Sequence, residues 1–159
     1  MIIGVPRETK PGEKRVALLP AAVQDLTAEG HDVQVEVRAG LASGFDDDAY
    51  RDAGAMVVAG RDAWDAELVV KVKEMQPAEI PFAPRGTPVF AFHHLTGAPE
   101  RVRQLAGAGL TVIAFEMVRD ARGGLPMLAP MSKIAGRMAI DVARTELGRV
   151  PQHVLVLGA

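Results

Sequence analysis

Short runs of almost wholly apolar residues recur along this sequence, separated by stretches with helical spacing. The clearest run is Val-Phe-Ala-Phe at 89–92, and His93 and His94 follow it at once. A strand this apolar is buried on both faces, as in a parallel sheet covered by helices on each side. Ligands of such sheets bind beyond the carboxyl ends of the strands, so both histidines stand where a ligand would be met.

A second run, at 68–73, passes from apolar residues into charge at Lys73 and Glu74. Further strands are predicted at 1–5, 32–37, 55–58 and 110–115. Helices are expected to follow Pro20, Asp46 and Pro99. Strands that alternate with helices predict an α/β fold, doubly wound, with a mostly parallel sheet.

The composition is that of a globular protein, with 48% hydrophobic and 24% charged residues in 159. This length suits one domain, or one domain plus a piece of another. A net charge of −2 gives no electrostatic reason to expect nucleic acid or a membrane surface as partner. The chain has no cysteine, which excludes disulfides and thiolate zinc ligands, and we expect no metal site. No apolar run is long enough to span a bilayer, so we expect an intracellular, cytoplasmic protein.

The last third of the sequence predicts a linker, a long helix and one more strand. Residues 119–130 carry glycines and prolines and are the candidate linker. Ser132 is a plausible N-cap for a helix over 133–147, which Gly148 would end. The apolar run 154–157 before Gly158 has the form of a first dinucleotide-binding strand entering its glycine-rich turn. An ordinary last strand of the first sheet fits that run equally well.

Several longer motifs occur in a fixed order along nearly the whole chain. They are Ile-Gly-Val-Pro-Arg-Glu at 3–8, Arg-Val-Ala-Leu-Leu-Pro at 15–20, Gly-His-Asp-Val at 30–33, Ala-Gly-Leu-Ala-Ser-Gly-Phe at 39–45, Leu-Val-Val-Lys-Val-Lys-Glu at 68–74, Phe-Ala-Phe-His-His-Leu at 90–95 and Leu-Ala-Pro-Met-Ser-Lys-Ile-Ala-Gly-Arg at 128–137. In these motifs the chain resembles alanine dehydrogenase and the related alpha subunit of NAD(P) transhydrogenase. The last two motifs favour the alanine dehydrogenase branch.

The resemblance implies a division into a Rossmann-like substrate-binding α/β domain over 1–130, a linking helix over 131–149, and the truncated start of an NAD-binding domain over 150–159. The chain departs from the family pattern in lacking a glycine-rich insertion before that last strand. The family's nucleotide domain would follow Ala159, and a returning segment would complete the first domain. We therefore expect a piece of a longer protein, or the first part of a split one, with some apolar faces of the first domain exposed.

The resemblance also assigns site residues. It implies that Arg15 grips a substrate carboxylate, that Lys73 is a second substrate contact and polarises the reacting carbonyl, and that His94 is the acid–base residue. A guanidinium forks onto a carboxylate with two parallel bonds, and a histidine titrates near neutral pH. Read from spacing alone, Arg15 also suits a solvated basic loop, Lys73 a strand end and His94 a buried core histidine. His93 has no family match and is expected to be structural or exposed.

Three further residues are expected to contact the cofactor: Met131, Ser132 and Gly158. Read from spacing alone, Met131 suits helix packing and Ser132 a helix cap. The cofactor implied is NAD, which we do not expect to bind fully to this chain.

The function implied is that of the N-terminal part of an enzyme that converts L-alanine, NAD and water into pyruvate, ammonia and NADH. Its partners would be pyruvate or L-alanine, with a homo-oligomer or a second chain that supplies the NAD domain. The alternatives are a fragment of a transhydrogenase alpha subunit, which would meet a membrane partner, and a non-catalytic dimerising module of the same fold.

Overall fold

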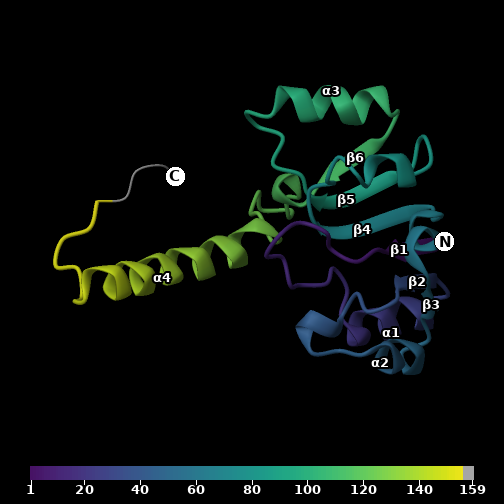
Figure 1. The fold of residues 1–159 in the computed structure, drawn as a ribbon, viewed down its shortest axis with the longest axis horizontal. Coiled ribbons are helices and arrows are strands. Elements are labelled where there is room, and N and C mark those ends of the chain that lie inside the picture. Colours follow the sequence, from purple (N-terminus) through teal and green to yellow (C-terminus); the bar gives the residue numbers. More distant parts are fainter. Residues whose placement is uncertain (156–159) are drawn as a thin grey trace. The chain divides into compact units, whose positions relative to one another are not determined.

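The computed structural model describes residues 1–155 and contains a six-stranded parallel sheet (Figure 1). The strands are β1 (Ile2–Val5), β2 (Asp32–Glu36), β3 (Met56–Val58), β4 (Leu68–Lys73), β5 (Pro88–Phe92) and β6 (Thr111–Ala114). Their order across the sheet is β3-β2-β1-β4-β5-β6, the order of Rossmann-type sheets. The predicted doubly wound α/β fold is therefore confirmed.

Helices connect most of the strands. They are α1 (Pro20–Ala28), α2 (Asp47–Asp52), α3 (Pro99–Gly107) and α4 (Leu128–Leu147), with short 3₁₀ turns η1 (Leu41–Ser43), η2 (Gly60–Trp64), η3 (Ile80–Phe82) and η4 (Phe115–Met117). Asp46 caps α2 as predicted, because its carboxylate accepts the Ala49 N–H at 2.9 Å. By internal contacts the chain divides into Met1–Phe115 and a C-terminal unit from Glu116, and each is described by itself.

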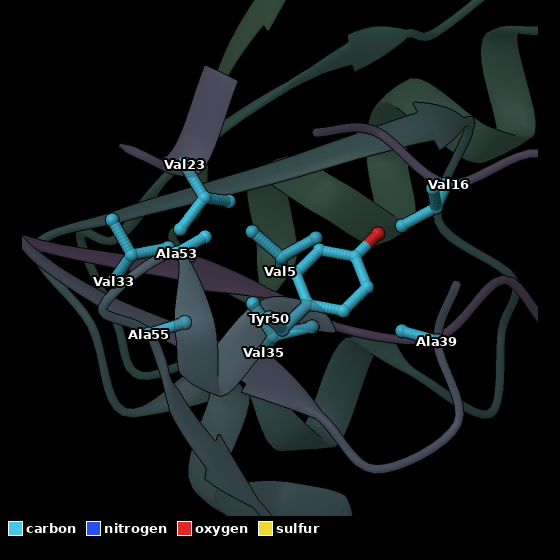
Figure 2. Packing of buried hydrophobic residues seen from close by; sticks show 9 residues of the cluster. All are labelled: Val5, Val16, Val23, Val33, Val35, Ala39, Tyr50, Ala53 and Ala55. Atoms are coloured by element: carbon cyan, nitrogen blue, oxygen red, sulfur yellow. The ribbon is translucent and has the colours of Figure 1, made fainter. Parts of the chain in front are cut away.

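One core lies between the first half of the sheet and helices α1 and α2 (Figure 2). Val5, Val33 and Val35 supply the sheet side, and Val23 supplies the α1 side. Tyr50 of α2 is fully buried in the middle, where its hydroxyl donates to the Leu18 carbonyl at 3.0 Å. Burial raises the pKa of Tyr50 to about 12, so the phenol stays neutral.

A second core covers the opposite face of the sheet. It joins Trp64 of η2, Val69 of β4, Val89 of β5 and Leu105 of α3. Successive side chains of a strand point to opposite faces, so Gly4 faces this side while Val5 faces the first core. A doubly wound sheet has connecting segments on both of its faces, so an apolar core forms on each face.

The C-terminal unit consists mainly of α4. The helix begins at Leu128, with Met127 as its N-cap, so the prediction that Ser132 caps a helix starting at 133 is wrong. Pro130 is compatible with this earlier start, since the first N–H groups of a helix need no intrahelical acceptor. Gly148 ends the helix at φ 64°, as predicted.

Several apolar side chains of α4 are exposed. They are Ile134, Met138, Ile140, Val142 and Leu147. Residues 150–155 contain no strand, and the rest of the predicted strand over 154–157 lies outside the described residues. Within residues 1–155, no helix is both long and apolar enough to cross a bilayer.

Replacing Gly4 with alanine is expected to destabilise the first unit strongly. A Cβ at Gly4 would overlap the Ala63 carbonyl oxygen, which belongs to the backbone of η2 and cannot swing away. We expect a loss of roughly 1–3 kcal/mol or more in the free energy of unfolding. Urea unfolding followed by the fluorescence of Trp64, the single tryptophan, measures it.

The matched control is Gly107→Ala at the end of α3, where an added Cβ meets no atom within 4 Å. Alanine favours a helix over glycine, so this variant should be neutral or up to about 1 kcal/mol more stable. Equal losses of unfolding free energy in both variants would contradict the close packing of β1 against η2 at Gly4.

Candidate active site at the carboxyl edge of the sheet

Three neighbouring strands end together at one edge of the sheet. β1, β4 and β5 are adjacent and parallel, so Val5, Lys73 and Phe92 all close their strands on the same side. The chain winds in one direction from β1 and in the other from β4. This reversal is the switch point at which open α/β sheets bind their ligands.

Arg15 lies in the long loop that follows β1, and its side chain is hydrogen-bonded to Glu13. Its Nε donates to Glu13 Oε1 at 2.8 Å and its Nη2 to Glu13 Oε2 at 2.6 Å. The backbone N–H of Arg15 also donates to Glu13 Oε1, at 2.9 Å. The Arg15 side chain is 42% exposed, whereas that of Glu13 is only 8% exposed. A buried carboxylate thus holds a guanidinium that faces solvent.

The charge of Lys73 acts on the same carboxylate, as the weakest of the causes that shift its pKa. The Arg15 hydrogen bonds are the main cause that lowers the pKa of Glu13 to about 2, and the charges of Arg15 and Lys73 add to it. Arg15 and Lys73 thus both lower the pKa of Glu13. A pocket of about 100 Å³ next to Arg15 is lined by residues that include Glu8, Glu13, Lys14 and Arg38, and Lys73 and His94 are not among its lining residues.

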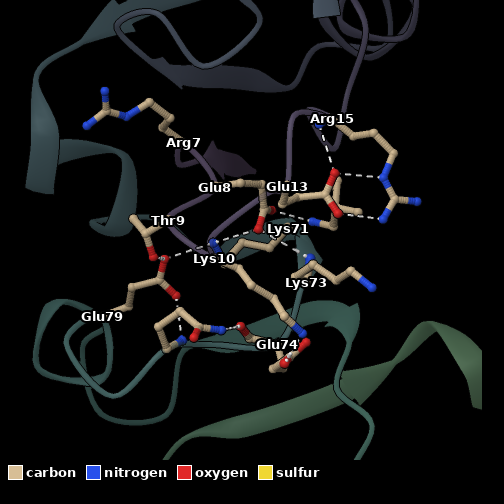
Figure 3. A network of polar contacts seen from close by, with 12 residues as sticks. Arg7, Glu8, Thr9, Lys10, Glu13, Arg15, Lys71, Lys73, Glu74 and Glu79 are labelled. Atoms are coloured by element: carbon tan, nitrogen blue, oxygen red, sulfur yellow. Dashed lines mark hydrogen bonds and ion pairs between the residues drawn. The ribbon is translucent and has the colours of Figure 1, made fainter. Parts of the chain in front are cut away.

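Beneath these residues Lys71 is buried between two carboxylates (Figure 3). Its ammonium lies 3.3 Å from Glu8 Oε2 and 3.1 Å from Glu79 Oε1, and its side chain is 1% exposed. Glu8 also accepts the backbone N–H groups of Val72 at 2.6 Å and Lys73 at 3.4 Å. Burial raises the pKa of Glu8, and the charge of Lys71 offsets this only in part.

More contacts join the loop after β1 to the region that follows β4. Thr9 donates its hydroxyl to Glu79 Oε1 at 2.5 Å, and Lys10 Nζ donates to Glu74 Oε1 at 2.6 Å. Burial acts to raise the pKa of Glu74, but the Lys10 bond and the charges of Lys10 and Arg101 leave it lowered. The loop that carries Arg15 is therefore fastened to the strand that carries Lys73.

The two histidines after β5 have different environments. His93 is fully buried, and its Nε2–H donates to the Val89 carbonyl at 2.9 Å. His94 is exposed and stacks on Phe92, with ring centroids 6.0 Å apart. The core-histidine interpretation therefore applies to His93 and not to His94. Phe92 of β5 pairs with Lys73 of β4. His94 is therefore two residues beyond the residue that pairs with Lys73.

His94 has a left-handed backbone, with φ 49°. This region disfavours residues other than glycine by roughly 1–2 kcal/mol. Such outliers cluster at functional sites, where the surrounding structure maintains them.

Two of the expected cofactor residues, Met131 and Ser132, are inside α4, in the C-terminal unit. The third, Gly158, lies outside the described residues. A thioether and one hydroxyl do not make a cradle for the pyrophosphate of NAD, so these two residues alone do not fit the whole cofactor. Among residues 1–155, no group of three histidine or acidic side chains is placed to hold a metal ion.

Sequence reasoning missed Glu8, Glu13, Lys71 and Glu79. One signal was present: Lys71 stands between Val70 and Val72 inside an apolar strand, and a buried ammonium requires an acidic partner. Nothing in the spacing indicated which acids would meet it.

Comparison with known proteins places these features in a family. The family model described as "Alanine dehydrogenase/PNT, N-terminal domain" matches residues 4–135. The alanine dehydrogenase of Bacillus subtilis (strain 168) is 48% identical over 143 residues, which cover 89% of this chain and 38% of that protein. The alanine dehydrogenase of Mycobacterium tuberculosis (strain ATCC 25618 / H37Rv) is 41% identical, covering 100% of this chain and 47% of that protein.

Solved structures agree with these matches. A structure of L-alanine dehydrogenase superposes with a TM-score of 0.86 at 43% identity, covering 100% of this chain and 45% of the other. A transhydrogenase from Sinorhizobium meliloti gives a TM-score of 0.72 at 37% identity, covering 77% of this chain and 37% of the other. The chain thus spans less than half the length of the relatives it matches.

Replacing Lys71 with methionine is expected to destabilise the first unit by roughly 3–5 kcal/mol, because two carboxylates would stay buried without their cation. Urea unfolding at neutral pH measures the loss. The triple variant Lys71→Met, Glu8→Gln, Glu79→Gln removes all three charges and should recover a large part of it. A loss below about 1 kcal/mol in the single variant would contradict a buried triad.

The Glu13 carboxylate is expected to make stability depend on acidity. Its pKa falls from the usual 4.5 to about 2 in the folded chain, so its contribution is fully present above pH 4.5. That contribution is lost as pH falls from 4.5 through 2, since the unfolded state then binds the proton more readily. The difference in unfolding free energy between the parent chain and Glu13→Gln should therefore shrink over this interval. A constant difference from pH 6 to pH 2 would contradict the ion pair.

Proposed function

Since the chain belongs to the family of alanine dehydrogenase and PNT N-terminal domains, we propose that it is the substrate-binding part of an NAD-dependent alanine dehydrogenase. The reaction is the conversion of L-alanine, NAD and water into pyruvate, ammonia and NADH. One observation carries the proposal: a buried carboxylate, Glu13, holds the half-exposed guanidinium of Arg15 in a loop that is fastened to β4, the strand that ends in Lys73. A guanidinium held in this way suits a small carboxylate ligand.

Each residue then has a distinct role. Arg15 orients the ligand carboxylate, because a guanidinium fixes the plane as well as the charge. Lys73 places its ammonium near the oxygen or nitrogen on the reacting carbon and stabilises negative charge that develops there. The exposed His94 exchanges a proton with that same oxygen or nitrogen. The left-handed backbone of His94 supports this role, since strain of this kind is kept where the side chain must point in one direction.

NAD, when bound, supplies the hydride acceptor for this chemistry. Of its expected contacts, Met131 and Ser132 belong to the described residues, and Gly158 would join them. We also propose that the complete protein is a cytoplasmic oligomer. The exposed apolar side chains Ile134, Met138 and Val142 of α4 support association with another part of the protein or a second copy.

Titration of pyruvate into the 159-residue chain tests the site. We expect saturable binding by calorimetry, and Arg15→Ala should weaken it at least about tenfold because a charge-assisted fork is lost. Arg51→Ala is the matched control: Arg51 is also an exposed arginine, paired with Asp48 in α2, and its loss should leave binding unchanged.

The same titration followed by NMR should shift the ring signals of His94 and leave those of the exposed His153 in place. Binding that survives Arg15→Ala, or pyruvate shifts at His153 and not at His94, would count against the proposed site.

A further inference from the structure

We propose that Glu13 orients Arg15 toward the ligand and restricts the site to ligands with a single carboxylate. This inference rests on the proposed function, because it concerns the same site. It goes further by naming a positioning residue and the property of the ligand that this residue selects.

The positioning argument follows from the geometry of the pair (Figure 3). Glu13 receives three hydrogen bonds from Arg15: two from the guanidinium, at 2.6 and 2.8 Å, and one from the backbone, at 2.9 Å. A carboxylate that binds Nε and Nη2 together fixes the plane of the guanidinium. Since Glu13 is 8% exposed and Arg15 is 42% exposed, the fixed guanidinium faces outward from a buried support.

The selectivity argument follows from the charge of Glu13. Its buried carboxylate lies 2.6 Å from Arg15 Nη2, so it is a fixed negative charge next to the group that binds the ligand. A second carboxylate on the ligand would add a negative charge beside Glu13, in a partly buried place where such repulsion is weakly screened.

The nearby Lys71 cluster adds to this repulsion. It has two carboxylates for one ammonium, and the charge of Glu8 also acts on Arg15. Lys14 and Arg38 line the same pocket but are exposed, so water and salt weaken their attraction for a second carboxylate.

Oxamate and oxalate test the selectivity. The two molecules are nearly equal in size and resemble pyruvate, but oxalate carries a second carboxylate where oxamate has a neutral amide. We expect the parent chain to bind oxamate more tightly than oxalate by calorimetry. In Glu13→Gln, which keeps the shape of the side chain and removes its charge, the ratio of the oxalate Kd to the oxamate Kd should fall about tenfold.

Glu29→Gln is the matched control. It removes the same charge from an exposed side chain that lies 4.0 Å from the His31 ring, and the ratio should not change. A variant with a damaged fold would bind both ligands more weakly. The proposal instead requires the affinity for oxalate to rise relative to the affinity for oxamate.

A measurement without ligand tests the positioning role. The Nε–H signal of Arg15 in ¹⁵N NMR should be protected from solvent exchange in the parent chain and lose at least about tenfold protection in Glu13→Gln. Unchanged protection, or an unchanged Kd ratio in a chain that binds pyruvate, would overturn the inference and leave the proposed function standing. Failure of the parent chain to bind pyruvate, oxamate or oxalate would overturn the proposed function and the selectivity with it.

Discussion

The ammonium of Lys71 is the interaction on which the arrangement of the site depends. It is buried in the second half of the sheet, with Trp64 on one side and the carboxylates of Glu8 and Glu79 around it. A charge in such a place is stable only with close partners, so the loop that carries Glu8 must lie against β4. The same contact brings the loop that carries Arg15 to the strand that carries Lys73.

The site above this triad is organised by carboxylates as much as by cations. Glu8 binds the backbone of β4 through Val72 and Lys73, and Glu13 binds the side chain and backbone of Arg15. Each carboxylate holds one of the proposed ligand contacts from a buried position. Acids that are not themselves proposed to contact the ligand therefore determine the positions of the cations that are.

The sequence was sufficient to predict the α/β class, the parallel sheet and most strands. Apolar runs such as 89–92 allow few other structures, and glycine and proline marked their ends. The start of α4 is earlier than the sequence predicts, because Pro130 suits a linker and is equally tolerated in the first turn of a helix.

The polar contacts were harder to predict for a physical reason. Lys71 and Glu8 are 63 positions apart, and no local periodicity connects them. Glu13 and Arg15 are two positions apart in a loop, where spacing does not determine which side chains meet. Which histidine would be buried depended on the left-handed turn at His94, and a non-glycine residue gives little warning of such a turn.

The parallel sheet has a consequence for how the chain acquires its shape. β1 pairs with β4, Ile3 with Leu68, so β1 stays without one of its two neighbours until the ribosome has made the chain through β4. Glu8 has no buried cation to meet before then. The carboxyl edge and the centre of the sheet therefore depend on contacts between distant segments, which favours slow folding.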